Sequence, residues 1–417
     1  MKPEHSAKDA AIEVIRRLRN EGHIALLAGG CVRDALLGQQ PKDFDIATDA
    51  RPDRVLQLFP RARKVGAQFG VMLIRRFGHD MEVATFRTDG EYSDGRRPDS
   101  VTFGNPEEDA LRRDFTINAL FSDPLTDEII DYVGGREDLA NGILRTVGHP
   151  RLRFREDHLR MLRAIRFAAR LSFVVHDETW SSLCEMAPRL QDISPERIWM
   201  ELENMLTAPS RVAAWRMLVK SKLIEHCLPD RDWIRPTSGD RPESALETMA
   251  TRLDALPLSV TDSLVMGAIL ADHSRDQIRC IARDLRWSNR LESEVSWLVE
   301  NVSILQSTDS MELADLKAIM NHSCWIHALA LLQAKLTANG QSLARLHAIL
   351  ERSALIPPER VNPAPLLDGH SLASLGIPHG PLTGKILREV RRAQLNETLD
   401  SIDAATALAK RLAEGND

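Results

Sequence analysis

Two aspartates, Asp43 and Asp45, stand two residues apart in the segment KDFDIAT, which has the apolar character of a short β-strand. Side chains alternate between the faces of a strand, so both carboxylates are predicted to face one side while Phe44 faces the opposite layer. Adjacent carboxylates repel unless a cation lies between them, and hard oxygen ligands suit Mg²⁺. By itself, however, a D-x-D pair is more often a solvated strand face or a turn.

A third carboxylate, Glu82, lies in the strand-like segment MEVATFR. A lone glutamate in a strand is usually just exposed to solvent. Glu82 becomes a candidate only because a neighbouring strand could bring it beside Asp43 and Asp45.

A double glycine, Gly29–Gly30, ends the apolar segment HIALLA and precedes the helical segment CVRDALLG. Backbone N–H groups at such a turn can bind an anion, and Arg33 could add a guanidinium to a phosphate. A plain turn explains the glycines about as well. A phosphate-binding turn within about fifteen residues of a carboxylate pair is more informative. Phosphate and Mg²⁺ ligands together indicate metal-assisted phosphoryl or nucleotidyl transfer, without a P-loop.

The segment FREDHLRMLRAIRFAARL is predicted to form one helix over residues 154–171. Asp157, Arg160 and Arg163 follow at steps of three residues and share one helix face, whereas Arg166 has drifted about half a turn away. An exposed ladder of ion pairs is the ordinary interpretation of such a face. The functional interpretation is a row of donors and acceptors that hydrogen-bonds the edge of a base.

The segment RRDFTINAL offers a second group of polar side chains. Arg113 could reach a phosphate, while Asp114 and Asn118 could reach ribose hydroxyls. A salt-bridged helix end is the alternative interpretation of the same residues.

Near the C-terminus, the segment LDGHSLASLGIPHGPLTGKILREVRRAQ predicts a helix, a glycine–proline turn and a second helix. The second helix carries Lys385, Arg388, Arg391 and Arg392, which could contact an RNA backbone. A solvated helix face explains these cations nearly as well.

The elements that position these residues change in character along the chain. Up to about residue 145, short apolar runs alternate with helical stretches, whereas helical periodicity without strands continues from about 150 to the end. The polar segment between Thr88 and Val101 is predicted to be a mobile loop. The segment ISPERIW predicts a helix with Ser194 as its N-cap and Pro195 at its first position. The sequence therefore predicts an α+β fold with an all-helical continuation.

Composition sets outer limits on the function. A chain of 417 residues is too long for one core, and its 43% hydrophobic and 27% charged residues are ordinary for a globular protein. The net charge of −6 gives no global sign of nucleic-acid binding. Five scattered cysteines favour a reducing cytoplasm over disulfides or a zinc site, and the sequence lacks a long apolar run that would span a membrane.

Taken together, these motifs resemble the class II tRNA nucleotidyltransferase and bacterial poly(A) polymerase family. The matching segments occur in the family's order over roughly residues 24–206, and they are GGCVRDALLG, KDFDIAT, VATFRTDGEYSDGRRPDSV, RRDFTINAL, DYVGGREDL, REDHLRMLRAIRFAARL and SPERIW. The segment GIPHGPLTGKILRE is similar to the family's C-terminal tail.

The resemblance implies an N-terminal nucleotidyltransferase head with a small mixed β-sheet, followed by an elongated all-α neck, body and tail. The corresponding ranges are 1–145 for the head, 146–206 for the neck with base recognition, 207–355 for the body and 356–417 for the tail. The implied partners are the tRNA 3′ end, CTP and ATP. Neither a membrane nor a protein partner is implied, and the expected location is the cytoplasm.

The resemblance also assigns roles to individual residues. Asp43 and Asp45 would hold two Mg²⁺ ions, one activating the RNA 3′-hydroxyl and the other steadying the triphosphate, with Glu82 as a third carboxylate. The residues that would contact the nucleotide phosphates are Gly30, beside Gly29, together with Arg33 and Arg113. The residues that would present a protein template to the base of CTP or ATP are Asp157 and Arg160, supported by Arg163 and Arg166. For Arg166 this role rests on the resemblance alone.

Within the family, the motifs favour CCA addition to tRNA over poly(A) tailing. The segment DGEYSDGRRPD resembles the flexible loop of CCA-adding enzymes, and EDHLR matches their E-D-x-x-R base-reading motif. Addition of the terminal A alone stays open, because A-only enzymes can share all of these motifs. Two other classes also stay open, namely a non-catalytic RNA-binding protein on a decayed head and a nucleotidyltransferase for small molecules.

Overall fold

The computed structural model describes residues 5–66, 70–90, 100–227, 242–307 and 311–414. The chain divides into two compact units, one formed by residues 1–231 with 284–286 and the other by residues 232–283 and 287–417. The four-part division into head, neck, body and tail is finer than this and stays a prediction. None of the described helices is long and apolar enough to cross a membrane.

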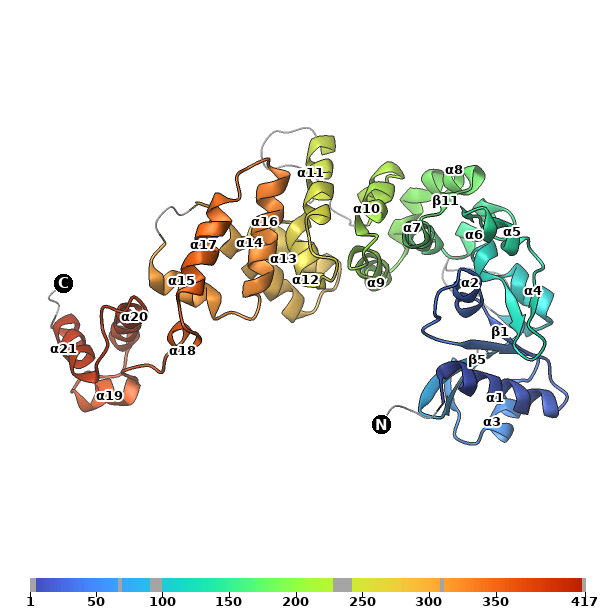
Figure 1. The fold of residues 1–417 in the computed structure, drawn as a ribbon, viewed down its shortest axis with the longest axis horizontal. Coiled ribbons are helices and arrows are strands. Elements are labelled where there is room, and N and C mark those ends of the chain that lie inside the picture. Colours follow the sequence, from blue (N-terminus) through green and yellow to red (C-terminus); the bar gives the residue numbers. More distant parts are fainter. Residues whose placement is uncertain (1–4, 67–69, 91–99, 228–241, 308–310, 415–417) are drawn as a thin grey trace. The chain divides into compact units, whose positions relative to one another are not determined.

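A seven-stranded sheet in the order β3-β4-β5-β2-β1-β8-β9 organises the first unit (Figure 1). Its strands are β1 (Ala25–Ala28), β2 (Asp45–Thr48), β3 (Arg63–Gly66), β4 (Val71–Arg76), β5 (His79–Thr85), β8 (Phe121–Asp123) and β9 (Glu128–Ile130). All neighbours pair antiparallel except β2 and β5, which are parallel. The predicted small mixed sheet is therefore confirmed.

Helices cover the two faces of this sheet differently. Helices α1 (Ala7–Asn20) and α3 (Pro52–Leu58) lie on one side of the strands, and α2 (Gly30–Leu36) lies on the other (Figure 1). The α1 side is closed, because alternate strand residues such as Met72 and Val83 are fully buried there.

The opposite face is closed by side chains over only part of its width. Over β1, β2 and β8 a core of Leu26, Ala28, Ala47 and Phe121 packs against Ala110, Ala119 and Val147. Toward β5, β4 and β3 the same face becomes polar and exposed, as the burial of successive strand residues shows. The boundary between the two halves falls at the start of β2.

The remaining elements of the first unit are mostly helical. They are α4 (Pro106–Leu111), α5 (Gly135–Ala140), α6 (Pro150–Glu156), α7 (Arg160–Leu171), α8 (Asp177–Met186), α9 (Pro195–Leu206), α10 (Arg211–Lys220) and short 3₁₀ helices at Thr116–Asn118, Ala187–Asp192 and Leu223–His226. The strands β6 (Arg87–Asp89) and β7 (Val101–Phe103) pair with each other, and so do β10 (Ile143–Leu144) and β11 (Val174–Val175).

Three sequence predictions are corrected here. The helix predicted over residues 154–171 is two helices, because the chain leaves α6 at Asp157 with φ −146° and ψ 105° and α7 begins at Arg160. A short strand, β11, follows residue 150, where none was predicted. The predicted loop between Thr88 and Val101 begins one residue later than predicted, because Asp89 is the last residue of β6 and pairs with Val101 of β7, and residues 91–99 lie outside the described part of the chain.

The C-terminal part of the chain is helical, as predicted. Its helices are α11 (Pro242–Asp254), α12 (Asp262–Ile269), α13 (Arg275–Asp284), α14 (Asn289–Ser307), α15 (Leu313–Met320), α16 (Trp325–Ala338), α17 (Ala344–Ala354), α18 (Pro358–Val361), α19 (Gly369–Ser374), α20 (Pro381–Leu395) and α21 (Ile402–Ala413). The last three helices share a small apolar core that includes Leu372, Ile386 and Ala405. The predicted helix–turn–helix around the glycine–proline turn is α19 and α20.

Candidate active site

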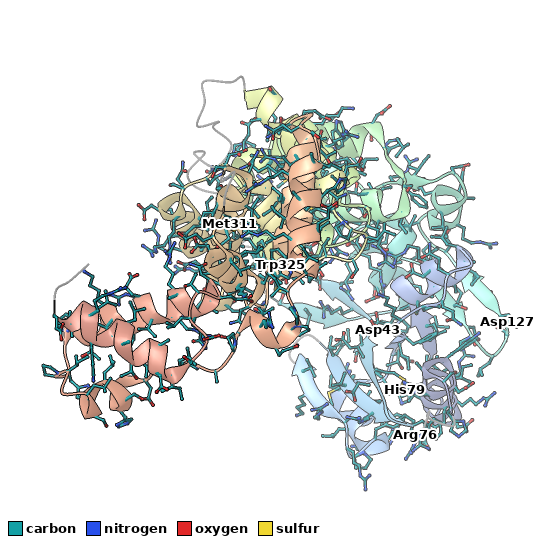
Figure 2. The ribbon with its side chains drawn as sticks, turned by 60° about the vertical axis from the view of Figure 1, so that its left-hand side comes forward. Asp43, Arg76, His79, Asp127, Met311 and Trp325 are labelled. Carbon is teal, nitrogen blue, oxygen red and sulfur yellow. The ribbon has the colours of Figure 1, made fainter. Side chains whose placement is uncertain are left out.

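The aspartate pair lies where the closed half of the sheet face gives way to the exposed half. Strand β2 begins at Asp45, so Asp43 belongs to the segment that enters the strand rather than to the strand itself, which corrects the predicted boundary. The alternation nevertheless holds, since Phe44 is buried and both aspartates are exposed. Asp43 lies beside the pale blue strands of the sheet (Figure 2).

Like charge accumulates around Asp45. The parallel register pairs Ile46 with Val83, and the preceding step places Asp45 beside Glu82. Although the side chain of Asp45 reaches solvent, nearby protein atoms displace much of the water around its carboxyl group. This loss of water and the negative charges of Glu82 and Asp43 raise the pKa of Asp45 to about 6, against an opposing effect of Arg113. A divalent cation would relieve this repulsion, so the oxygen donors of Asp43 and Asp45 fit Mg²⁺.

Glu82 lies beside Asp43 and Asp45 but does not complete a set of metal ligands with them. Among the described residues, no three acidic, histidine or cysteine side chains converge closely enough to hold a metal ion. The role of Glu82 as a third ligand therefore stays a prediction.

The glycine turn is shaped around Arg113. Gly29 has φ +71°, and its N–H donates to the carbonyl of Leu120 over 3.0 Å. A Cβ at Gly29 would lie 2.9 Å from Nη1 of Arg113, which itself donates to the carbonyl of Asn118 over 2.9 Å. Gly30 opens α2 without such crowding. Gly29 is thus required both for its backbone conformation and for the close approach of Arg113.

Substitution of Gly29 by alanine is expected to destabilise the protein by about 2 kcal/mol and to weaken nucleotide binding, because the new Cβ displaces Arg113. The matched control is Gly38→Ala, which has the same φ of +71° but open space around its Cα. Chemical denaturation and nucleotide titration compare the two variants. Equal nucleotide affinities in the two variants would show that Arg113 does not depend on this turn.

Arg33 faces the protein interior. Its guanidinium is 3% exposed, donates from Nε to Oδ1 of Asp34 over 2.8 Å, and donates from Nη1 to Oδ1 of Asn118 over 2.5 Å. Asp34 also accepts from Arg170 over 3.1 Å. The structure thus gives Arg33 a role in orienting Asn118, and its predicted direct contact with phosphate stays a prediction.

Asp114 connects this cluster to α7. Its Oδ2 accepts from Nε and Nη2 of Arg163 over 3.0 and 2.8 Å, and its Oδ1 accepts from the side chain of Asn118 over 3.1 Å. Burial alone would raise the pKa of Asp114, but Arg163 and the Asn118 hydrogen bond outweigh it and lower the pKa to about 2. Asp114 and Asn118 are therefore fixed in place.

Because the folded-state pKa of Asp114 lies below its ordinary 3.8, its ionised form stabilises the fold at neutral pH by about 2 kcal/mol. This contribution is complete above about pH 4 and is lost as the pH falls toward 2. Asp114→Asn is expected to lower the free energy of unfolding at pH 7 by about that amount and to flatten its pH dependence between 4 and 2. Denaturant titrations across this range test the expectation, and an unchanged acid slope would contradict it.

The two base-reading candidates lie at the break between α6 and α7, not along one helix face. Asp157 accepts from the backbone N–H of Leu159 over 3.1 Å and from Arg197 on α9 over 2.9 Å. Arg160 is 9% exposed and donates to Glu156 and to the carbonyls of Arg153 and Arg112. The positions of both side chains therefore depend on the short non-helical turn that joins α6 to α7.

Arg166 belongs to the same network although its helical spacing separated it from Asp157. Its Nε donates to Oε2 of Glu201 over 2.6 Å, and Glu201 also lies 3.7 Å from Arg163. The sequence did not reveal three acidic residues of this network, namely Glu201 on α9, Asp34 and Asp109. Asp109 orients Arg113 through an ion pair of 3.0 Å. The signal for Glu201 was an acidic residue on the apolar side of the SPERIWMELENML helix.

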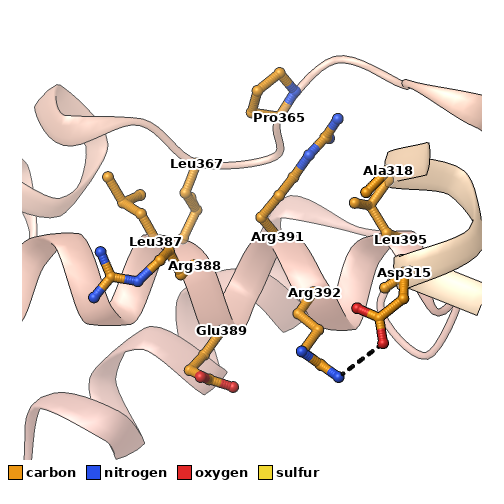
Figure 3. A pocket seen from close by; sticks show the side chains of 11 residues that line it. Asp315, Ala318, Pro365, Leu367, Leu387, Arg388, Glu389, Arg391, Arg392 and Leu395 are labelled. Carbon is orange, nitrogen blue, oxygen red and sulfur yellow. Dashed lines mark hydrogen bonds and ion pairs between the residues drawn. The ribbon is translucent and has the colours of Figure 1, made fainter. Parts of the chain in front are cut away.

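The predicted tail cations are not equivalent. Arg391 donates to the carbonyl of Pro363 and the side chain of Asn362, and Arg392 pairs with Glu312 over 2.9 Å and Asp315 over 3.4 Å. They border a cavity of about 690 Å³ with apolar walls that include Leu367 and Leu387 (Figure 3). Lys385 and Arg388 are exposed. The contact of these tail cations with RNA stays a prediction. Glu312 and Asp315 neutralise most of the positive charge of Arg392.

The chain is similar to known proteins in both sequence and fold. Residues 25–145 match the family model for the poly A polymerase head domain, and residues 172–234 match the probable RNA and SrmB-binding site of polymerase A. A CCA-adding enzyme of Lactobacillus johnsonii is 33% identical over 401 residues, which are 95% of each chain. The chain belongs to the CCA-adding enzyme family. Another member, from Enterococcus faecalis, is 39% identical over 72% of each chain.

Similarity to other members of the CCA-adding enzyme family is concentrated in part of the chain. A CCA-adding enzyme of Geobacillus sp. is 46% identical over 214 residues, so the match spans about half the length of that relative. The solved Bacillus stearothermophilus CCA-adding enzyme in complex with CTP has a TM-score of 0.80 with 29% identity over both whole chains. A Thermotoga maritima CCA-adding enzyme complexed with tRNA, at 20% identity and a TM-score of 0.66, shares the fold.

Proposed function

We propose that this chain adds or repairs the 3′-terminal CCA of tRNA, using CTP and ATP without a nucleic-acid template. The observation that carries the proposal is the position of Asp43 and Asp45 on the exposed sheet face, in a protein whose family members include solved complexes with CTP and with tRNA. Membership of the CCA-adding enzyme family over 95% of the chain favours this activity over poly(A) tailing.

Asp43 and Asp45 would hold two Mg²⁺ ions. The raised pKa of Asp45 supports this, because loss of surrounding water and the negative charges of Glu82 and Asp43 both disfavour its ionised form, and a bound cation would offset both effects. Bound there, the ions would activate the RNA 3′-hydroxyl and neutralise the charge of the pyrophosphate leaving group. Glu82 would assist from the neighbouring strand.

The remaining residues would bind and orient the nucleotide. Arg113, positioned by Asp109 and the Gly29 turn, would contact the triphosphate. Asp114 and Asn118, fixed by Arg163 and Arg33, would hold the ribose. Their supporting partners are buried or ion-paired, so the binding groups are pre-organised before the nucleotide arrives.

Asp157 and Arg160 would present hydrogen-bonding groups to the base edge. Glu156 and two backbone carbonyls hold Arg160, and Arg197 holds Asp157, so neither side chain is free to adapt to a wrong base. A rigid pair of this kind can discriminate bases without a template strand.

The deciding experiment offers tRNA ending before CCA, ending in C and ending in CC, with each nucleotide alone and with CTP and ATP together. Ordered use of CTP twice and ATP once establishes CCA addition. Use of ATP on the CC-ended tRNA alone would mean A-only addition, and long A tails on any RNA would mean a poly(A) polymerase. Absence of incorporation, Mg²⁺ binding and nucleotide binding would revive the non-catalytic RNA-binding alternative.

A further inference from the structure

A continuous row of residues crosses the sheet at the level of the aspartates. The strand registers align Ile130, Phe121, Ala28, Asp45, Glu82, Leu73 and Arg63, from β9 at one edge to β3 at the other. Paired residues of neighbouring strands share a face, so Arg63 lies on the same face as Asp45 and Glu82. The row therefore runs from the apolar core through the carboxylates to an arginine on the edge strand.

A second arginine lies on this face. Arg75 follows Leu73 by two residues on β4 and pairs across the strands with Asp80. The next residue, Arg76, faces the opposite side, where it forms an ion pair with Glu13 of α1 over 2.8 Å, and Figure 2 labels it beside His79 at the end of the hairpin. The alternation along β4 therefore directs Arg76 toward α1, where it stabilises the fold, and Arg75 toward the open face.

The charges of Arg63 and Arg75 are only partly balanced. Both side chains are about two-thirds exposed, at 67% and 66%, and both share one carboxylate, Asp80, at 3.9 Å. That separation is too long for a hydrogen bond, and exposed pairs of this kind contribute little to stability. Two guanidiniums and one carboxylate leave a net positive charge beside Asp43 and Asp45. We call Arg63 and Arg75 the arginine strip.

We propose that Arg63 and Arg75 contact the phosphates of the tRNA primer strand just upstream of the reacting 3′-hydroxyl; this rests on the proposed function. Three strand spacings separate Arg63 from Asp45, or about 14 Å, which a few nucleotides of a single strand can span. The carboxylates and their metal would hold the terminal nucleotide. The arginine strip would hold the backbone that leads to it, so the sheet face sets the direction of the primer.

The test compares Arg63→Gln, Arg75→Gln and the double variant with Lys64→Gln. Lys64 is exposed and adjacent to Arg63 on β3, but it pairs with the buried Met72 and belongs to the opposite face, so its variant loses the same charge from the same edge. The KM for CC-ended tRNA is measured with ATP at several salt concentrations. Each arginine variant is expected to raise this KM about two- to five-fold and to reduce the salt slope by roughly 0.7.

The kcat and the KM for ATP are expected to stay unchanged, because the strip does not touch the nucleotide. Arg63→Lys should restore most of the tRNA affinity, since a phosphate contact needs the charge. If Arg63→Gln and Lys64→Gln change the tRNA KM equally, or if neither changes it, the strip does not contact the primer. If the unmodified protein fails to extend any tRNA, the proposed function fails instead, so the two failures are distinguishable.

Discussion

Alanine at Asp43 or Asp45 is expected to lower nucleotide incorporation by a factor on the order of 10³ or more, while tRNA binding and folding stay intact. Each variant removes one of the two oxygen donors that the exposed sheet face offers to a divalent metal. Folding should not suffer, because both side chains reach solvent. In addition, Asp45→Ala removes a carboxyl group whose pKa is raised by loss of surrounding water and by like charge, and Asp43→Ala removes one of those like charges. The free energy of unfolding is therefore expected to stay the same or to rise slightly.

Single-turnover incorporation of ATP into CC-ended tRNA, tRNA binding and denaturant unfolding are the three measurements. The matched control is Asp80→Asn, a carboxylate on the same sheet face that pairs with Arg63 and Arg75 instead of the aspartate pair. The single-turnover rate of Asp80→Asn is expected to stay close to that of the unmodified protein. Full activity in either alanine variant would refute the metal assignment, whereas lost activity with lost folding would make the aspartates structural.

Arg160→Ala is expected to relax nucleotide choice, lowering the preference for CTP over UTP by about 10- to 100-fold in kcat/KM. The estimate follows from the discrimination that one bidentate contact with a base supplies, about 1–3 kcal/mol. Triphosphate binding should change less, because Arg113 and the Gly29 turn are set by other contacts.

The structure adds a second expected effect of this substitution. Arg160 is buried and donates to Glu156 and to the carbonyls of Arg153 and Arg112, so truncation should also cost about 2–3 kcal/mol of stability. Arg160→Lys separates the two effects, since lysine keeps the charge near Glu156 but loses the planar pair of donors. Unchanged selectivity in both variants, measured well below their unfolding temperatures, would contradict the template role.

Local sequence chemistry determined a large part of this protein. Alternation around Phe44 placed Asp43 and Asp45 on one exposed face, and that prediction holds even though β2 begins only at Asp45. The alternation of short strands and helices in the first 145 residues, the helical continuation and the helix–turn–helix of α19 and α20 also followed from hydrophobic period and turn residues, whereas the mixed sheet was implied by the resemblance to the family. These features depend on neighbours in the chain, which the sequence displays directly.

Other features depended on contacts between distant segments. Helical spacing placed Asp157 and Arg160 on one face, yet the chain breaks at Asp157, where tertiary contacts with Arg197 and the carbonyl of Arg112 decide the conformation. Helical spacing likewise separated Arg166 from Asp157. Contacts of Arg166 and Arg163 with Glu201 of α9 nevertheless connect Arg166 to the same network.

The register of the sheet is a further feature that the sequence does not display and that only the tertiary structure decides. From the sequence, Glu82 was a candidate only if a neighbouring strand brought it beside the aspartates, and nothing in the sequence singled out Arg63. Only the pairing of β2 with β5, β5 with β4 and β4 with β3 aligned both residues with Asp45. The sequence by itself determined which residue types could hold metal and phosphate, because side-chain chemistry is local. The tertiary structure decided which of them meet, because strand order and register join residues that are far apart in the chain.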